Sequence, residues 1–219
     1  MTNGNGDLHG SAPDTCPVAL LLIDMINDLA FPEGPRLLRR ALPLADRLAA
    51  LAARARRAGV PVIWVNDNFG RWRSDFRTLI AHCVRPGAIT RPLVERLAPP
   101  ASEDYFVVKP KHSGFFDTTL ELLLRHLGTR TLVLTGMATE ICVLFTANDA
   151  YMRGFDLMVP RDGVASSNTA GHNQALALMQ SALKATLVTS DVIDFAALAG
   201  RKRQRHALRR PGTRIRQAS

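Results

Sequence analysis

The feature that most constrains the fold is a series of six short apolar runs, separated by segments with helical periodicity. The first run, Val18–Ile23, is apolar at every position, which is typical of a strand buried on both faces of a parallel sheet. Five more runs follow, at Pro61–Val65, Asp104–Val108, Thr131–Leu134, Phe155–Val159 and Ala185–Thr189. The alternation predicts an α/β fold: a three-layer αβα, Rossmann-like, doubly wound parallel six-stranded sheet in the order 3-2-1-4-5-6.

Helices are expected between these strands. Their apolar periodicity and glycine stops place them at Pro43–Ala58, at Thr118–Leu127, from the segment after Gly136 to Gly154, at Asn168–Leu183 and at Asp191–Leu198. Pro43 is expected in the first turn of its helix. Residues 73–100 are read as an insertion with one or two short helices.

Length and composition fit one domain. The chain has 219 residues and 47% hydrophobic content, which suits a single core. We expect a disordered N-terminal segment at 1–16, one folded domain at 17–200 and a basic disordered tail at 201–219. The tail holds eight of the 28 Lys and Arg residues and no acid, so the remaining 20 nearly balance the 19 acidic residues.

The location expected from the sequence is cytoplasmic. The N-terminal segment lacks the basic and apolar regions of a signal peptide, and no apolar run approaches the roughly 18–20 residues needed to span a bilayer. The three cysteines are an odd number without CxxC spacing. A disulfide framework or a zinc ribbon is therefore not expected, and a reducing compartment is the simpler assumption.

Three residues of complementary chemistry follow predicted strands at one edge of the sheet. Asp24 ends the first strand, Lys109 ends the third, and Cys142 follows the fourth, where a helix begins. In doubly wound sheets ligands bind beyond the carboxyl ends of the strands, so the three are predicted to converge. Each has a plainer interpretation: a turn cap for Asp24, a solvent-exposed ammonium for Lys109 with Lys111 as its rival, and a small buried apolar side chain for Cys142.

Together the three form a plausible nucleophilic site. A cysteine attacks as its thiolate, which the start of a helix should stabilise. Asp24 would take the thiol proton, and Lys109 would hold the negative charge. Backbone N–H groups of the loop before Cys142 would bind a developing oxyanion. The histidines are not placed for the base role, and His82, Cys83 and His172 are read as packing, hydrogen-bonding or surface residues.

At this point the chain resembles the isochorismatase-like cysteine hydrolases. The matching blocks are Leu21–Met25, Val107–Lys109 with Ser113–Thr118, and Thr135–Val143 with Thr146–Ala150. The resemblance implies a six-stranded parallel sheet and an Asp24–Lys109–Cys142 triad. It also implies a cis peptide bond at Met137–Ala138, which would direct the N–H of Ala138 toward the same oxyanion as the N–H of Cys142. Members of the family are usually homo-oligomers, dimers or tetramers.

One departure from the family bears on the substrate. Nicotinamidases of the family carry an Asp-x-His pair and a further histidine after the second strand, whereas this chain reads Asn66-Asp-Asn-Phe-Gly-Arg-Trp72 there, without histidine. We therefore expect no metal and no cofactor, and do not expect nicotinamide as substrate. Isochorismatases proper act on a vinyl ether without the cysteine, so Cys142 favours hydrolysis of an amide or carbamoyl C–N bond through a thioester.

The substrate itself is not identified by the sequence. Candidate pocket residues are Asn68, Phe69, Trp72 and Phe115, which lie on loops after the second and third strands. Two alternatives remain open: vinyl-ether hydrolysis at the same site, and a non-enzymatic binder that holds nucleic acid through the basic tail. A small-molecule substrate is the expected partner, and neither a membrane nor nucleic acid is.

Overall fold

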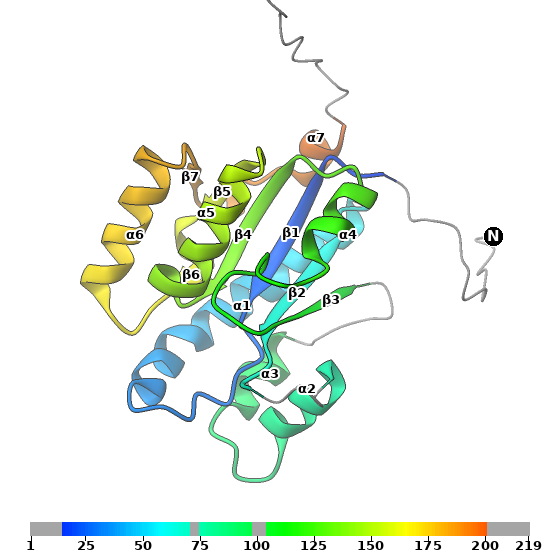
Figure 1. The fold of residues 1–219 in the computed structure, drawn as a ribbon. Helices are drawn as coiled ribbons and strands as arrows, with labels where there is room; N and C mark the ends of the chain where they lie inside the picture. Colours follow the sequence, from blue (N-terminus) through cyan, green and yellow to red (C-terminus); the bar gives the residue numbers. More distant parts are fainter. Residues whose placement is uncertain (1–14, 71–74, 98–103, 201–219) are drawn as a thin grey trace, which may run out of the picture.

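Six parallel strands form the central sheet in the computed structural model, which describes residues 15–70, 75–97 and 104–200 (Figure 1). Their order is β3-β2-β1-β4-β5-β7, which confirms the predicted order. The strands are β1 (Val18–Ile23), β2 (Val62–Asp67), β3 (Tyr105–Lys109), β4 (Thr131–Met137), β5 (Asp156–Pro160) and β7 (Thr186–Val188). A two-residue strand that was not predicted, β6 (Val164–Ala165), pairs with the end of β4.

The central strand β1 explains why the sheet has helices on both sides. All six of its residues are buried. Val18, Leu20 and Leu22 pack into the apolar cluster beneath α1 (Gly34–Arg57), whereas Ala19, Leu21 and Ile23 pack into the cluster on the opposite face. Because successive side chains of a strand point to opposite faces, a run without polar residues needs a cover on each.

Two helical layers provide that cover. One face carries α4 (Leu120–His126), α5 (Leu144–Met152) and α6 (Thr169–Ser181), and the other carries α1 and α7 (Phe195–Ala199) (Figure 1). The segment predicted as an insertion holds α2 (Phe76–Val84) and α3 (Arg91–Leu97), and α3 packs against α1. The helix predicted at Asp191–Leu198 is instead a single 3₁₀ turn, Ser190–Val192, followed by α7, whose first turn is capped by the Asp194 side chain.

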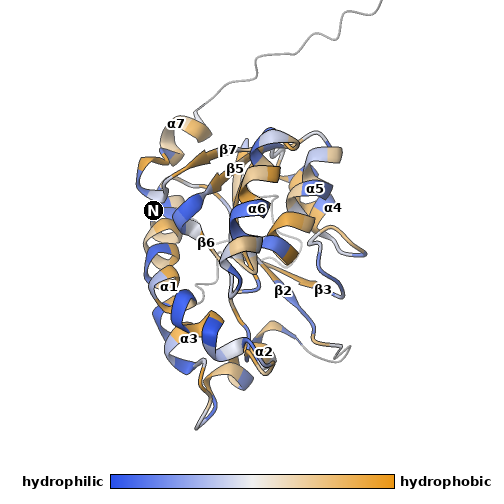
Figure 2. Ribbon diagram, turned by 90° about the vertical axis from the view of Figure 1, so that its left-hand side faces the viewer, coloured by the Kyte–Doolittle hydropathy of each residue, from blue (hydrophilic) through white to orange (hydrophobic). Residues whose placement is uncertain are grey.

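The helix α1 is longer than predicted, and Pro43 lies inside it rather than in its first turn. The buried positions Leu37, Ala41, Leu44 and Leu48 continue through the proline with helical spacing. α1 carries hydrophilic and hydrophobic residues along its whole length (Figure 2), as an amphipathic helix should. Burial of this apolar face therefore outweighs the hydrogen bond that a proline removes.

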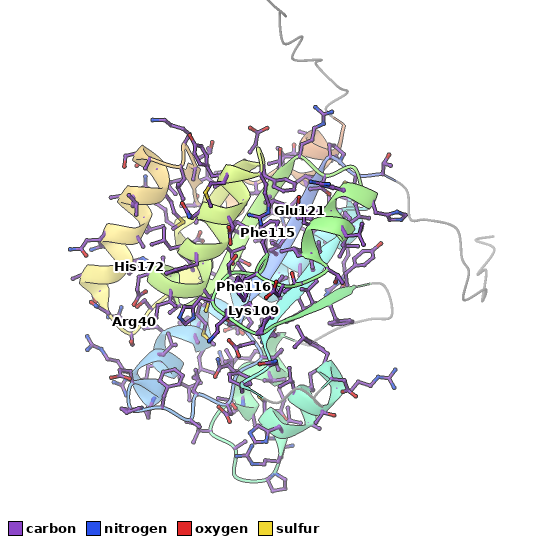
Figure 3. All side chains as sticks on the ribbon, in the orientation of Figure 1. Arg40, Lys109, Phe115, Phe116, Glu121 and His172 are labelled. Atoms are coloured by element: carbon purple, nitrogen blue, oxygen red, sulfur yellow. The ribbon has the colours of Figure 1, made fainter. Side chains whose placement is uncertain are left out.

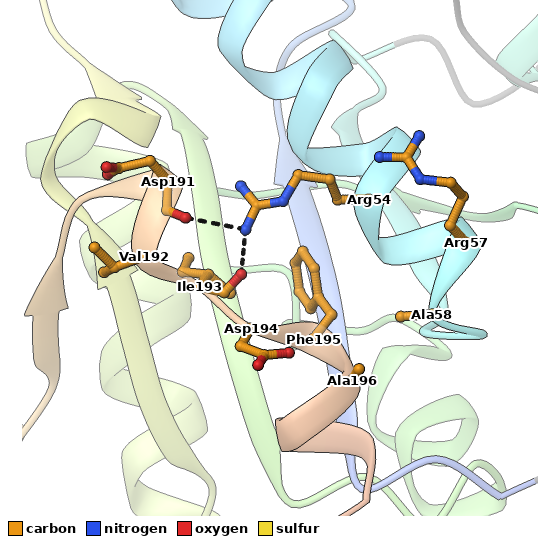
Figure 4. Close-up of a pocket in the computed structure, with 9 residues that line it drawn as sticks. All are labelled: Arg54, Arg57, Ala58, Asp191, Val192, Ile193, Asp194, Phe195 and Ala196. Carbon is orange, nitrogen blue, oxygen red and sulfur yellow. Dashed lines mark hydrogen bonds between the residues drawn. The ribbon is translucent and has the colours of Figure 1, made fainter.

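Arg54 of α1 ties this helix to the segment after β7 (Figure 4). Its guanidinium donates to the carbonyl oxygens of Ser190 at 3.0 Å and Asp191 at 3.2 Å, and to that of Ile193. A cavity of about 420 Å³ lies beside it, lined by α1 and residues 191–196. This cavity contains none of the predicted site residues.

The folded domain begins slightly earlier than predicted. Cys16, the last residue of the segment expected to be disordered, is buried, and its N–H donates to Leu127 O at 2.8 Å. The remaining predictions for 1–14 and for the tail at 201–219 lie outside the described residues. In the part of the chain that the structure describes, no helix is long and apolar enough to cross a membrane.

Candidate active site

The carboxyl ends of β1, β2, β3 and β4 bring the predicted site residues to one edge of the sheet. Ile23 lies opposite Val65 of β2 on one side and opposite Gly136 of β4 on the other. Asp67, the last residue of β2, lies opposite Lys109 of β3. Asp24 directly follows Ile23, so strand register brings Asp24, Asp67 and Lys109 together. The turn after β4 brings Cys142 to the same edge.

Lys109 is the centre of the cluster. Its side chain is fully buried (0% exposed), and its Nζ lies 2.8 Å from Asp24 Oδ2 and 3.6 Å from Cys142 Sγ. The same ammonium donates to the carbonyl oxygen of Lys111 at 3.1 Å. Lys111, the rival candidate, is exposed. Lys109 therefore contacts both the acid and the sulfur, and sits at the lower edge of the sheet in Figure 3.

Asp24 is held from three directions. Its N–H donates to Val65 O at 2.8 Å, its Oδ1 accepts from the N–H of Asp67 at 2.7 Å, and its Oδ2 pairs with Lys109 Nζ at 2.8 Å. Its backbone is left-handed, with φ of 51°, which is uncommon for a residue other than glycine. This conformation turns the chain at the end of β1 and leaves the carboxylate fixed beside Lys109.

The turn that carries Cys142 begins on β4, which runs through Met137, three residues beyond the predicted end of the strand. Gly136 has a φ of 115°, and a Cβ there would lie 2.0 Å from Ile23 O, so only glycine fits. The peptide bond Met137–Ala138 is cis, at the position that the resemblance implies. A π-helical turn, Thr139–Val143, follows and leads into α5.

Two side-chain hydrogen bonds hold this π-helical turn to the neighbouring segment that begins α6. Thr139 Oγ1 and His172 Nδ1 lie 2.9 Å apart, and Glu140 Oε1 accepts from Ser166 Oγ at 2.6 Å. His172, predicted to pack or hydrogen-bond, thus contacts the turn from α6 (Figure 3). Arg40 of α1 donates to Ser166 O at 3.0 Å, which extends the support to the opposite helical layer.

Burial governs the protonation of the cluster. Burial first, and then the charge of Asp24, raises the pKa of the Cys142 thiol, and these effects outweigh Lys109. Burial likewise raises the pKa of Asp24 against the lowering effect of Lys109. Burial would lower the pKa of Lys109, but the charges of Asp24 and Cys142 raise it overall. The raised pKa of the Cys142 thiol is opposite in direction to the stabilised thiolate that was expected at the start of the helix.

The residues predicted to line a substrate pocket differ in burial, and Phe115 is among the buried ones. Phe115 is only 5% exposed. It packs in the core with its ring 5.9 Å from that of Phe155 and 4.9 Å from the guanidinium of Arg153. The prediction for Phe115 is therefore wrong, because the loop turns this ring inward and leaves the adjacent Phe116 49% exposed. Figure 3 labels both rings on the loop after β3.

The other predicted pocket residues belong to the loop after β2. Asn68 is buried; its Oδ1 accepts from Gly70 N at 2.9 Å, and its N–H donates to Lys109 O at 3.0 Å. It is therefore a turn residue that supports Lys109. Phe69 is 40% exposed, and its role in binding stays a prediction, whereas Trp72 lies outside the described residues.

Sequence reasoning missed Asp67. Its Oδ2 lies 3.4 Å from Lys109 Nζ, so the lysine has two carboxylates beside it. The sequence did contain a signal for this residue: Asp67 is an acidic residue at the end of a mainly apolar strand, as Asp24 is. Among residues 15–70, 75–97 and 104–200, no group of three or more His, Cys, Asp or Glu side chains could hold a metal ion.

Comparison with known proteins relates this chain to one family. Residues 18–192 match the family model described as the Isochorismatase domain. The chain is 37% identical to the uncharacterized isochorismatase family protein YaaI of Bacillus subtilis, over 80% of this chain and 95% of that protein. It is 31% identical to the ureidoacrylate amidohydrolase RutB of Methylorubrum extorquens, over 65% of this chain and 67% of that protein.

Solved structures show the same architecture. The N-carbamoylsarcosine amidase from Thermoplasma acidophilum superimposes with a TM-score of 0.61 at 27% identity, covering 81% of this chain and 98% of that one. The nicotinamidase PncA from Bacillus subtilis superimposes with a TM-score of 0.59 at 28% identity, covering 78% of this chain and 99% of that one.

Proposed function

The chain belongs to the isochorismatase family, and from that premise we propose that it is a cysteine hydrolase of a small amide or carbamoyl compound. It is a hydrolase acting on carbon–nitrogen bonds, the bond class that the names of its amidohydrolase and amidase relatives share. The observation that carries the proposal is the position of Lys109 Nζ, 2.8 Å from the Asp24 carboxylate and 3.6 Å from the Cys142 sulfur.

The reaction begins with a proton transfer. Asp24, which meets Cys142 at the Lys109 ammonium, takes the proton of the Cys142 thiol, and the thiolate attacks the carbonyl carbon of the substrate. The number of charges does not change, because one negative charge moves from the carboxylate to the sulfur. Lys109 lies beside both, so the buried ammonium remains paired before and after the transfer.

The tetrahedral intermediate places a negative charge on the former carbonyl oxygen. In the proposal this oxyanion is bound by the backbone N–H groups of Ala138 and Cys142. Loss of one such donor typically costs about 3–4 kcal/mol of transition-state stabilisation. The C–N bond then breaks, and the protonated Asp24 gives its proton to the departing nitrogen, which leaves a thioester on Cys142.

Hydrolysis of the thioester completes the cycle. Asp24, again a carboxylate, takes a proton from water, which attacks the thioester carbonyl. The sulfur leaves as a thiolate and recovers its proton from Asp24. Water supplies the oxygen of the product acid, and the enzyme returns to its starting protonation state.

The test is replacement of the sulfur. A screen of small amides and carbamoyl compounds for ammonia release would identify a substrate, and the Cys142→Ala variant should then lose turnover by about 10³-fold or more. The matched control is Cys83→Ala, which removes a buried thiol from α2 and should retain kcat. If Cys142→Ala turns over substrate at the wild-type rate, the nucleophile assignment is wrong, and hydrolysis that does not use the thiol becomes the better account.

A further inference from the structure

We propose that Asp67 is a positioning residue of this site. Its carboxylate shares Lys109 with Asp24, and its main-chain N–H holds the Asp24 carboxylate in place. The inference rests on the proposed function, because it assigns Asp67 a role in the same proton transfer from Cys142 to Asp24.

Three contacts place Asp67 between the reacting groups and the loop beyond β2. Its N–H donates to Asp24 Oδ1 at 2.7 Å, and its Oδ2 lies 3.4 Å from Lys109 Nζ. Its Oδ1 accepts from the N–H of Phe69 at 2.6 Å, which closes a turn that presents an exposed phenylalanine ring. One residue therefore connects the base, the lysine and the loop.

The difference in burial between the two carboxylates separates their roles. The Asp24 side chain is 6% exposed and the Asp67 side chain is 26% exposed. A partly hydrated carboxylate keeps its charge more easily than a buried one. In the proposal Asp24 gains and loses the proton, and the more exposed Asp67 carboxylate acts only on the charge of Lys109.

A standing anion beside Lys109 matters for the strength of the base. An ammonium 2.8 Å from Asp24 makes that carboxylate a weaker proton acceptor. Among the residues that the structure describes, the charged or titratable groups that contact Lys109 are Asp24, Asp67 and Cys142, and the ammonium also donates to the carbonyl oxygen of Lys111. By offsetting part of the lysine charge, Asp67 leaves Asp24 basic enough to take the thiol proton.

The substitution that isolates the charge is Asp67→Asn. An asparagine retains an oxygen that can accept from Phe69 N–H, and its main chain can still donate to Asp24, so the turn is preserved. We expect the acid limb of the pH profile of kcat/KM to move to lower pH by at least about half a unit. We expect kcat to fall roughly tenfold, because a weaker base transfers the proton less readily, with KM little changed.

Two further variants complete the test. Asp67→Ala also removes the acceptor for Phe69 N–H, so KM should rise in addition to the change in kcat. Asp46→Asn removes an exposed carboxylate of α1 that pairs with Arg96, and should leave both the pH profile and kcat unchanged. Far-UV circular dichroism and thermal unfolding would verify that each variant is folded.

The outcomes are distinct from those that test the proposed function. If Asp67→Asn has the wild-type pH profile and kcat while Cys142→Ala is inactive, the role of Asp67 is refuted and the cysteine mechanism stands. If Cys142→Ala remains active, the mechanism itself fails. A shifted acid limb in Asp67→Asn, absent in Asp46→Asn, supports the inference.

Discussion

Two regions of this protein place a cysteine near a carboxylate and a basic side chain, yet they differ in what the three groups can do together. In the first, Cys142, Asp24 and Lys109 meet at the carboxyl edge of the sheet. In the second, Cys83 and His82 lie on α2, with His82 Nε2 2.9 Å from Asp28 Oδ2. Residue types alone do not distinguish the two groups.

In the second region the thiol lies in the core, whereas the acid and the base lie at the surface. Cys83 is buried in the apolar cluster beneath α1, and burial, with the charge of Asp28 second, raises the pKa of its thiol to about 11. His82 and Asp28 each keep about a quarter of their side chains exposed. The acid and the base therefore pair at the surface, while the sulfur is packed away from solvent.

The first region reverses this arrangement. The charged pair Lys109–Asp24 is buried, and Cys142 is the most exposed of the three residues. A buried cation close to both the acid and the sulfur can stabilise a negative charge on either. The comparison teaches that burial of the ion pair, rather than the presence of a cysteine near an acid, distinguishes the candidate active site.

Removal of the buried cation should cause the largest loss of stability and activity in the first region. In Lys109→Met the Asp24 carboxylate loses its nearest cation while still buried, and loss of one partner of a buried ion pair typically costs about 3–5 kcal/mol. We expect a fall of that size in the free energy of unfolding by urea, and a loss of kcat/KM of about 10³-fold or more. A variant with wild-type stability and activity would show that the Lys109–Asp24 pair contributes neither to folding nor to the reaction.

Chemical labelling should separate the two cysteines by their access to solvent. Iodoacetamide should modify Cys142 of the native protein at least about 100-fold faster than Cys83, because a fully buried thiol reacts only when the structure opens. Peptide mass spectrometry after timed quenching would give both rates, and denaturant should make them equal. Comparable native rates would contradict the distinction drawn between the regions.

The pH dependence of activity should report the buried carboxylate of the first region. Burial raises the pKa of Asp24 above its ordinary value of 3.8, and the proposed reaction needs the ionised form. Activity should therefore be present above the raised pKa and be lost as pH falls through it, by about tenfold per unit below. A profile of kcat/KM that stays flat down to pH 4 would rule out Asp24 as a base with a raised pKa.

The second region should tolerate the loss of its base. His82→Ala removes a partly exposed pair, which typically contributes about 0–1 kcal/mol to stability, and should leave kcat/KM unchanged. Urea unfolding and steady-state kinetics would measure both. A large loss of activity here would mean that α2 contributes to the site in a way that the contacts of His82 do not explain.

Most of the fold could be predicted because each strand has a strong local pattern. Val18–Ile23 is unbroken, and the other main strands are short runs in which apolar residues predominate. Pro43 and β6 could not be predicted in this way. A proline inside a helix is tolerated because of tertiary packing along α1, and a two-residue strand has no periodicity to detect.

The candidate site was predictable where strand ends fix position. Asp24, Lys109 and Cys142 all follow from the topology of the sheet, since parallel strands end at a common edge. Phe115 and Phe116 could not be assigned from sequence, because adjacent rings on one loop differ only in which way the backbone turns. Asp67 could not be singled out, because it lies in the polar run Asn66–Asn68, which is equally typical of a turn.

The pairing of β1 with β4 has a consequence for the order in which the protein can assemble. Thr135 Oγ1 donates to Leu21 O at 2.7 Å across 114 positions of the chain, and Gly136 meets Ile23 with no room for a side chain. Contacts this distant in sequence form slowly, since a long loop must close first. During synthesis β1 must wait with one apolar edge unpaired until β4 emerges, so a substitution at Gly136 should lower the yield of folded protein before it affects any reaction.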